Sequence, residues 1–163
     1  MPASGDIEVC YRSEYHRLVG VVAVVTGSVA LAEESVQEAF ARALVRSRRG
    51  RPFDHLAAWI VTVALNHARS GRRSASSERR ALQRIGSSPS PSVVDRAEAL
   101  MLRDAIAGLS RRQRDAVVLY YLLDMKVDAV AASLGVSQGT VKTALSRARA
   151  HLAEILHDTE LEA

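Results

Sequence analysis

The sequence predicts an all-α fold made of two small helical domains joined by a flexible linker, the C-terminal domain containing a helix-turn-helix. Apolar residues recur mostly at helical spacing in both halves of the chain. Aromatic residues make up only 4% of it, so the cores must be built from Ala, Val and Leu, and strand-type runs are few. A Ser- and Pro-rich stretch separates the halves. We therefore place one domain at 1–75, the linker at 76–93 and the second domain at 94–163.

Composition limits the function classes. The chain has 163 residues, a net charge of +4 and a pI of about 9.7, which favours a polyanionic partner. Cys10 is the sole cysteine, so an internal disulfide and a cysteine-based zinc site are both excluded, and a reduced, cytoplasmic location is expected. The apolar run 18–25 is too short to span a bilayer, and the acidic start lacks the basic leader of a signal peptide. We expect no cofactor, no metal site and no membrane insertion.

Two helices are expected before the loop that begins at Arg46. The first is expected to begin at a cap on Asp6 and to stop at Thr26-Gly27. Ser28 is a natural cap for the second. The second helix carries acidic groups in its first half and arginines in its second half, an order that suits the helix dipole. These charges either solubilise the helix or face a partner surface, and the residues alone do not decide between the two.

A basic loop is expected over Arg46–Asp54, because Gly50 and Pro52 interrupt the helical pattern. Asp54 is then the predicted cap of a third helix, whose end carries Asn66, Arg69, Arg72 and Arg73. His67 is interpreted as a packed or half-exposed histidine, since no second metal ligand lies at i+4.

The second domain is expected to begin with an amphipathic helix at about 94–107 that Gly108 ends. Ser110 and Gln113 then have the spacing of a capping box, in which the serine and glutamine side chains satisfy each other's free backbone donors. The next helix carries Tyr120 and Tyr121, which we interpret as packing residues rather than base-stacking ones.

A helix-turn-helix is predicted over Met125–Leu156. One apolar stripe ends at Leu134, and Gly135 can take the left-handed conformation that closes a helix. Ser137 is the expected cap of the next helix. The outer face of that helix is polar and cationic, with Gly139, Lys142, Thr143 and Ser146 flanked by Arg147 and Arg149. Such a face is how a helix-turn-helix presents a recognition helix to the major groove, although a helical hairpin with a solvated cationic face gives a similar pattern.

Three segments resemble bacterial RNA polymerase sigma factors of the extracytoplasmic-function class. AEESVQEAFARA (Ala32–Ala43) is similar to the family's polymerase-binding helix. AWIVTVALNHARSGRR (Ala58–Arg73) is similar to its promoter-opening helix. Leu109–Leu152 resembles its reader of the upstream promoter element. The order and spacing of the three segments, with a Ser/Pro linker between the second and third, carry the resemblance.

The resemblance implies a role for each domain. The first domain would bind core RNA polymerase at the clamp helices of its largest subunit, and would recognise and melt the minus-ten element. The second would read the minus-thirty-five element next to the polymerase flap. An anti-sigma factor is an implied further partner, and no bond chemistry is implied, so the chain is not expected to be an enzyme.

The residues that match the family's functional positions are implied in three sets. The polymerase-binding set is Glu33, Glu34, Gln37 and Glu38. The minus-ten set is Arg48, Arg49, Arg51, Asn66, Arg69, Arg72 and Arg73. The minus-thirty-five set is Ser137, Gln138, Thr140, Lys142, Thr143, Ser146, Arg147 and Arg149.

Two other function classes were weighed. A stand-alone repressor or activator would use the same helix-turn-helix without polymerase, but its usual dimerisation element is not evident, since no coiled-coil seam is seen. An enzyme is least favoured, because Glu33 and Glu34 are adjacent and point to different sides of a helix, the histidines lack ligand spacing, and no phosphate-binding glycine loop appears.

Overall fold

The computed structural model describes residues 4–75 and 93–162. Within these ranges every regular element is helical, which confirms the predicted all-α class. The first range holds α1 (Ser4–Thr26), α2 (Val29–Arg48) and α3 (Leu56–Ala75). The second holds α4 (Val93–Ala107), α5 (Arg111–Val117), the π-helical turn η1 (Val118–Leu122), α6 (Val127–Leu134) and α7 (Gln138–Glu162).

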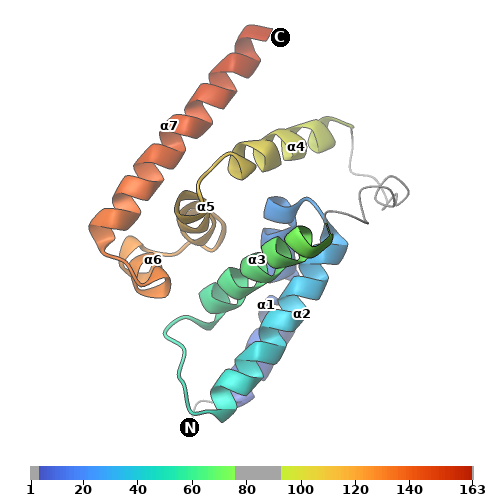
Figure 1. Ribbon diagram of the computed structural model, residues 1–163, viewed down its shortest axis with the longest axis vertical. Coiled ribbons are helices and arrows are strands. Elements are labelled where there is room, and N and C mark those ends of the chain that lie inside the picture. Colours follow the sequence, from blue (N-terminus) through green and yellow to red (C-terminus); the bar gives the residue numbers. More distant parts are fainter. Residues whose placement is uncertain (1–3, 76–92, 163) are drawn as a thin grey trace.

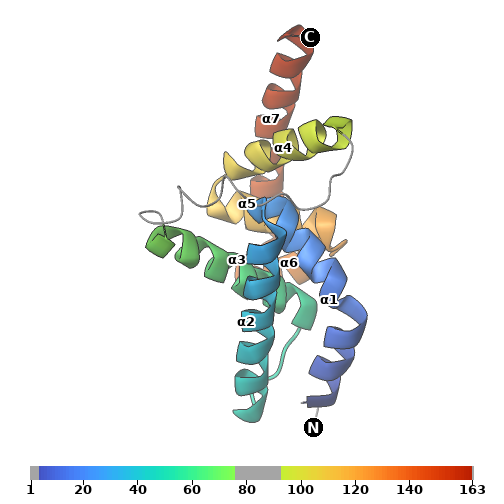
Figure 2. The same ribbon diagram turned by 90° about the vertical axis from the view of Figure 1, so that its right-hand side faces the viewer.

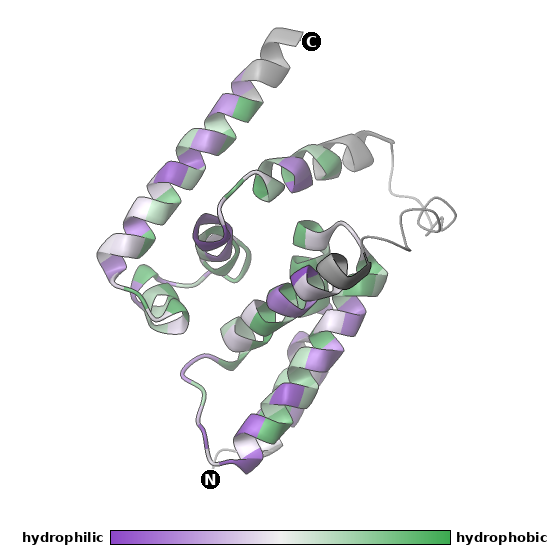
Figure 3. Ribbon diagram, in the orientation of Figure 1, coloured by the Kyte–Doolittle hydropathy of each residue, from purple (hydrophilic) through white to green (hydrophobic). Residues whose placement is uncertain are grey.

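Helices α1, α2 and α3 pack on one another as a bundle (Figure 1). Leu18, Val22, Val36, Ile60 and Val61 are among its fully buried side chains. Burying an apolar side chain of this size contributes about 1.5–3 kcal/mol, so the bundle is stabilised chiefly by these contacts. In Figure 3 the hydrophobic residues of the three helices lie along the faces that meet.

In the second range, α5 and α6 both pack against α7. Val118, Leu119, Val130, Val141 and Leu145 are fully buried there. The predicted capping box forms, since Ser110 Oγ accepts from the amide of Gln113 at 3.3 Å and Gln113 Oε1 accepts from the amide of Ser110 at 3.0 Å. The N-terminus of α5 is therefore fixed by its own sequence.

The two ranges also contact each other, and α4 lies against α1 (Figures 1 and 2). Gly27 closes α1 with φ +71°, and a Cβ at that position would lie 2.5 Å from Cδ of Arg103 on α4. Glycine is favoured there by the left-handed turn, and any larger residue would also displace the flexible side chain of Arg103.

Several predicted boundaries were correct and three were wrong. Ser28 caps α2, its Oγ accepting from the amide of Leu31 at 3.2 Å. Helix α1, however, begins at Ser4, so Asp6 lies in its first turn instead of capping it. The basic loop begins after Arg48 because α2 continues through the arginines. Helix α3 begins at Leu56, so Asp54 does not hold the cap position. The predicted linker falls almost wholly outside the described residues.

Candidate nucleic-acid interface

The turn between α6 and α7 has the geometry that the sequence predicted. Gly135 ends α6 with φ +65°, and the amide of Val136 donates to the carbonyl of Ala131 at 3.0 Å. Ser137 then caps α7, because its Oγ accepts from the amide of Thr140 at 3.1 Å. The two hydroxyl groups of Ser137 and Thr140 lie 2.9 Å apart. A short, rigid corner of this kind holds α7 at a fixed angle to α6.

Helix α7 has one buried and one exposed face. Val141, Leu145 and Ala148 are at most 2% exposed and face α5 and α6. Thr140 is half-buried, as its part in the cap requires. The other predicted residues of this set are all exposed: Ser137, Gln138, Lys142, Thr143, Ser146, Arg147 and Arg149. The structure therefore brings the predicted set together on one polar and cationic surface, which we call the α7 face.

Arg149 is the residue of the α7 face that another element holds in place. Its Nε donates to the hydroxyl of Tyr121 at 2.7 Å, and its guanidinium carbon lies 5.9 Å from the centroid of the Tyr121 ring. This hydrogen bond raises the pKa of Arg149 above its ordinary value. Tyr121 is 51% exposed, so its interpretation as a packing residue was wrong, whereas Tyr120 is half-buried against the core.

The end of α3 carries two of the predicted minus-ten residues in described positions. Asn66 and Arg69 are both half-buried. The side-chain carbonyl oxygen of Asn66 accepts a hydrogen bond at 2.6 Å from Nη2 of Arg111 at the start of α5. No local pattern predicts this contact, because the two residues are 45 positions apart. The side chains of Arg72 and Arg73 lie outside the described residues.

The other predicted minus-ten residues lie where α2 ends. Arg48, Arg49 and Arg51 are exposed. Arg49 and Arg51 line a pocket of about 160 Å³ together with Arg42, Val45, Arg46 and Trp59. A cationic pocket beside an aromatic ring has the chemistry that binds single-stranded nucleic acid, in which bases stack and phosphates need cations.

Arg46 was missed as a member of this pocket. Its guanidinium lies 5.2 Å from the Phe53 ring centroid and 5.7 Å from that of Trp59, and its Nη2 donates to the carbonyl of Pro52 at 3.0 Å. Phe53 and Trp59 themselves meet edge to face at 5.1 Å. Arg46 therefore fastens the loop after α2 to the start of α3, and a cation flanked by aromatics at i+7 and i+13 was the only sequence signal for it.

The predicted polymerase-binding residues lie together on α2. Glu33, Glu34 and Gln37 are exposed, and Glu38 is half-exposed in an ion pair with Arg42 at 2.7 Å. Gln37 donates to the hydroxyl of Tyr15 at 3.1 Å. Glu34 lies 3.8 Å from Nε2 of the half-buried His67 on α3. We call Glu33, Glu34, Gln37 and Glu38 together the acidic face of α2.

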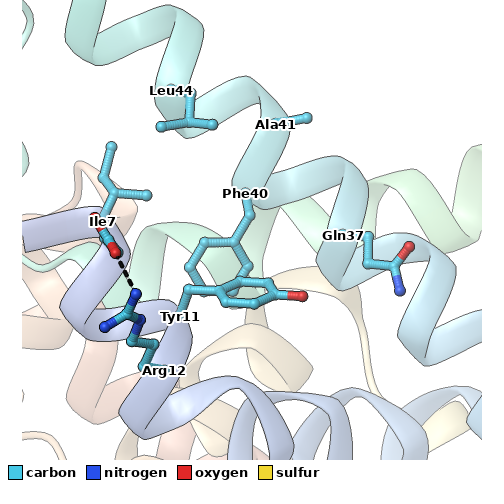
Figure 4. A pocket seen from close by; sticks show the side chains of 8 residues that line it. Ile7, Tyr11, Arg12, Gln37, Phe40, Ala41 and Leu44 are labelled. Carbon is cyan, nitrogen blue, oxygen red and sulfur yellow. Dashed lines mark ion pairs between the residues drawn. The ribbon is translucent and has the colours of Figure 1, made fainter. Parts of the chain in front are cut away.

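An open groove of about 690 Å³ borders the acidic face between α1 and α2 (Figure 4). The Tyr11 and Phe40 rings meet edge-on inside it, with centroids 5.1 Å apart, and Gln37 stands at one end. Tyr11 is 44% exposed and Leu44 38% exposed, so the groove offers apolar surface to solvent. Cys10, one residue away, is a half-buried thiol whose pKa is raised by burial and by the charge of Glu14.

Two family models and a curated relative match most of the chain. Residues 10–78 match the family model for sigma-70 region 2, and residues 99–152 match that for sigma-70 region 4. The ECF RNA polymerase sigma factor SigL of Mycobacterium tuberculosis is 35% identical over 133 residues, which cover 74% of this chain and 71% of SigL. The chain belongs to the ECF class of RNA polymerase sigma factors. This sigma factor has the two matched regions in the order that the sequence predicted.

Other relatives match less of the chain or of themselves. The RNA polymerase sigma-E factor of Streptomyces antibioticus is 43% identical over 67 residues, which are 41% of this sigma factor and 37% of that protein. The chain thus spans little more than a third of the length of that relative. The sigma factor CarQ of Myxococcus xanthus is 29% identical over 151 residues, covering 90% of this chain and 86% of CarQ.

Two solved structures share the fold of this sigma factor. The sigma factor RpoE of Bartonella quintana, solved with the anti-sigma factor NepR, aligns with a TM-score of 0.69 at 23% identity, covering 94% of this chain and 98% of that one. CnrH, solved with the cytosolic domain of CnrY, aligns with a TM-score of 0.67 at 22% identity, covering 93% and 88%.

The described ranges contain neither a membrane-spanning helix nor a cluster of metal ligands. No helix within them has both the length and the apolar character needed to cross a bilayer. Among the same residues, no three His, Cys, Asp or Glu side chains gather closely enough to hold a metal ion.

Proposed function

We propose that this sigma factor binds core RNA polymerase and directs it to specific promoters. The observation that carries the proposal is the α7 face, in which short polar and cationic side chains are exposed along one side of a capped, rigidly held helix. Membership of the sigma family supports the partner, since region 2 and region 4 occur in one chain. The factor performs no bond chemistry itself in this proposal, and it acts in the cytoplasm, where polymerase and promoters meet.

Polymerase binding is assigned to α2. The acidic face offers Glu33, Glu34 and Gln37 to a partner, and the adjoining groove offers the apolar surface of Tyr11 and Leu44. Charged groups around an apolar centre are typical of protein interfaces, because the charges set orientation and the apolar contacts supply affinity. The clamp helices of the largest subunit are the proposed partner of this surface, and the flap is the proposed partner of the C-terminal domain.

Promoter DNA is assigned to two surfaces. The α7 face reads the minus-thirty-five element, where Lys142 and Arg147 hold phosphate and Thr143 and Ser146 approach base edges. The cationic pocket at the end of α2, together with Asn66, Arg69, Arg72 and Arg73, holds the melted minus-ten element. We place the boundary of the two DNA-binding domains in the linker at 76–93.

An anti-sigma partner is part of the proposal. RpoE, which shares the fold over nearly all of this chain, was solved in complex with the anti-sigma factor NepR, and CnrH, which also shares the fold, was solved with the cytosolic domain of CnrY. A protein that covers the acidic face of α2 or the α7 face would block polymerase or promoter binding.

Run-off transcription tests the proposal. Core polymerase mixed with the full chain is expected to start transcription at defined sites on genomic fragments, and core polymerase alone is not. Absence of chain-dependent starts would contradict the proposal. Tight binding of the chain to a palindrome without polymerase would instead favour a stand-alone repressor or activator.

A substitution in α2 tests the polymerase surface separately. Glu34→Arg reverses the charge of an exposed side chain and should reduce co-purification with core polymerase while the fold remains intact. Asp54→Arg, in the exposed loop between α2 and α3, makes the same charge change outside the acidic face, the adjoining groove and the C-terminal domain, and serves as the control. Equal co-purification of the two variants would remove the acidic face from the interface.

A further inference from the structure

Tyr121 is a part of the C-terminal domain that the proposed function leaves unused. It lies in η1, the π-helical turn that follows α5 directly. Leu119 and Leu123 on either side are buried, whereas Tyr121 is 51% exposed. A π turn is rare in proteins and is frequently found at functional sites, since it widens the helix and redirects one side chain. Here the redirected side chain is the tyrosine that meets Arg149.

The contact between Tyr121 and Arg149 fixes one nitrogen of the guanidinium. Nε donates to the tyrosine hydroxyl at 2.7 Å, and the guanidinium carbon lies 5.9 Å from the ring centroid. Tyr120 packs edge-on against the Tyr121 ring, with centroids 4.8 Å apart at 86°, and so limits the motion of that ring. No described residue accepts a hydrogen bond from the two terminal amino groups of Arg149, so they stay available to a ligand.

Arg149 differs in this respect from the other cations of the α7 face. Lys142 and Arg147 are exposed, and no described residue holds either side chain. Each must lose rotamer freedom when it binds a phosphate, whereas Arg149 has already lost part of it to Tyr121. A planar guanidinium held through Nε presents its two amino groups side by side, which is the geometry that binds phosphate oxygens in pairs.

We propose that Tyr121 is a positioning residue for promoter binding, whose hydroxyl holds the Arg149 guanidinium ready to bind a DNA phosphate. This inference rests on the proposed function, because it takes Arg149 to be a DNA contact. Tyr121 itself touches no DNA in the proposal and acts only through the arginine. A purely structural role, in which Tyr121 stabilises η1 without acting through Arg149, makes a different prediction for a pair of substitutions.

A double-mutant cycle separates the two roles. Holoenzyme is assembled from core polymerase and the full chain, and its affinity is measured for the duplex that unaltered holoenzyme selects from a random pool. The variants are Tyr121→Phe, Arg149→Ala and the two combined. Tyr121→Phe keeps the ring and removes only the hydroxyl. Tyr120→Phe is the matched control, since it removes a neighbouring hydroxyl that makes no hydrogen bond with Arg149.

If Tyr121 positions Arg149, the effects of the two substitutions on DNA affinity should be non-additive. Tyr121→Phe should weaken binding by roughly 2- to 10-fold, the range expected when one side chain must be immobilised on binding. The slope of log affinity against log salt concentration should be unchanged in Tyr121→Phe. Arg149→Ala should lower that slope by about 1, because it removes a phosphate contact. The double variant should bind no more weakly than Arg149→Ala alone. Tyr120→Phe should bind like the unaltered chain.

Three results would overturn the inference, and they are distinguishable. Additive losses in the double variant would show that Tyr121 acts independently of Arg149. Unchanged affinity of Tyr121→Phe beside a weakened Arg149→Ala would reject positioning while leaving the arginine as a contact. Unchanged affinity of Arg149→Ala would reject that contact and the positioning with it, whereas failure to assemble a promoter-selecting holoenzyme would defeat the proposed function itself.

Discussion

Nη2 of Arg111 donates a 2.6 Å hydrogen bond to the side-chain carbonyl oxygen of Asn66, and the two residues belong to different sigma regions. Arg111 begins α5 and also lies 3.8 Å from the carboxylate of Asp115 one turn later. Asn66 stands on α3 among the residues assigned to the minus-ten element. The same carbonyl oxygen cannot be fully available to a nucleobase while the arginine occupies it.

Arg111→Ala should therefore make Asn66 more available. A hydrogen bond to a charged group contributes about 1.5–3 kcal/mol when it is shielded from solvent. Because Arg111 is largely exposed, we expect its bond to Asn66 to contribute about 1 kcal/mol. The free chain of the variant should therefore bind single-stranded minus-ten DNA with roughly 5-fold higher affinity. Small-angle scattering should show a larger radius of gyration. Arg112→Ala is the control, since Arg112 is the exposed neighbour of Arg111 and does not donate to Asn66. Equal behaviour of the two variants would contradict the prediction.

Lys142→Ala tests the α7 face. Lys142 is exposed beside the buried Val141, so its removal should not disturb the core. If it holds a phosphate, promoter binding weakens by a similar factor on all sequences, and the salt slope falls by about 1. Arg17→Ala is the control, because it removes one positive charge from α1, which lies outside the proposed DNA-binding surfaces. It should leave the salt slope unchanged. A slope that Lys142→Ala does not alter would reject the phosphate contact.

Asp115→Ala should destabilise the C-terminal domain strongly. Asp115 is 7% exposed and accepts from Nη2 of Arg114 at 2.8 Å, and the Arg114 side chain is itself only 13% exposed. Removing the carboxylate leaves a buried cation without its partner, which costs about 2–4 kcal/mol. Urea unfolding measures the loss. Asp104→Ala breaks an exposed pair with Arg103 at 3.6 Å and should cost less than about 0.5 kcal/mol. Similar losses in both variants would be inconsistent with this account.

Asp124 gives a test of backbone strain. It is the one non-glycine residue of the described ranges with a positive φ, at +53°, in the connection between η1 and α6. A side chain with a Cβ is strained there, so Asp124→Gly should be more stable than Asp124→Ala by about 1 kcal/mol. Thermal unfolding compares the pair. If the alanine variant were the more stable of the two, the positive φ would carry no cost.

Local features of this fold were predictable because their causes lie within a few residues. Ser28 and the Ser110-Gln113 capping box act over three positions, and Gly135 closes α6 by its own conformation. The sequence predicts that α2 ends before Arg46, because Gly50 and Pro52 disfavour a helix, whereas α2 in fact continues through Arg48. Helix propensity of Arg carries the helix through Arg48, and the amide of Arg49 still donates to the carbonyl of Arg46.

The exposed side of α7 was predictable from the sequence, whereas the contacts that its residues make were not. The α7 face follows from helical spacing, since the buried stripe at Val141 and Leu145 leaves one side outward. The hydrogen bonds of Tyr121 with Arg149 and of Asn66 with Arg111 span 28 and 45 positions. No local rule links such pairs, because they depend on how α3, α5 and α7 pack.

The hydrogen bond from Arg111 to Asn66 also constrains how the two ends of the sigma factor influence each other. If docking of α5 on α3 lowers the affinity of Asn66 for DNA by some factor, DNA at Asn66 must lower the stability of that docking by the same factor. A nucleic acid bound at the proposed minus-ten surface would thereby weaken the hydrogen bond between α3 and α5. The contact thus couples two equilibria, so that the docking of the C-terminal helices and the binding of DNA at Asn66 weaken each other by equal factors.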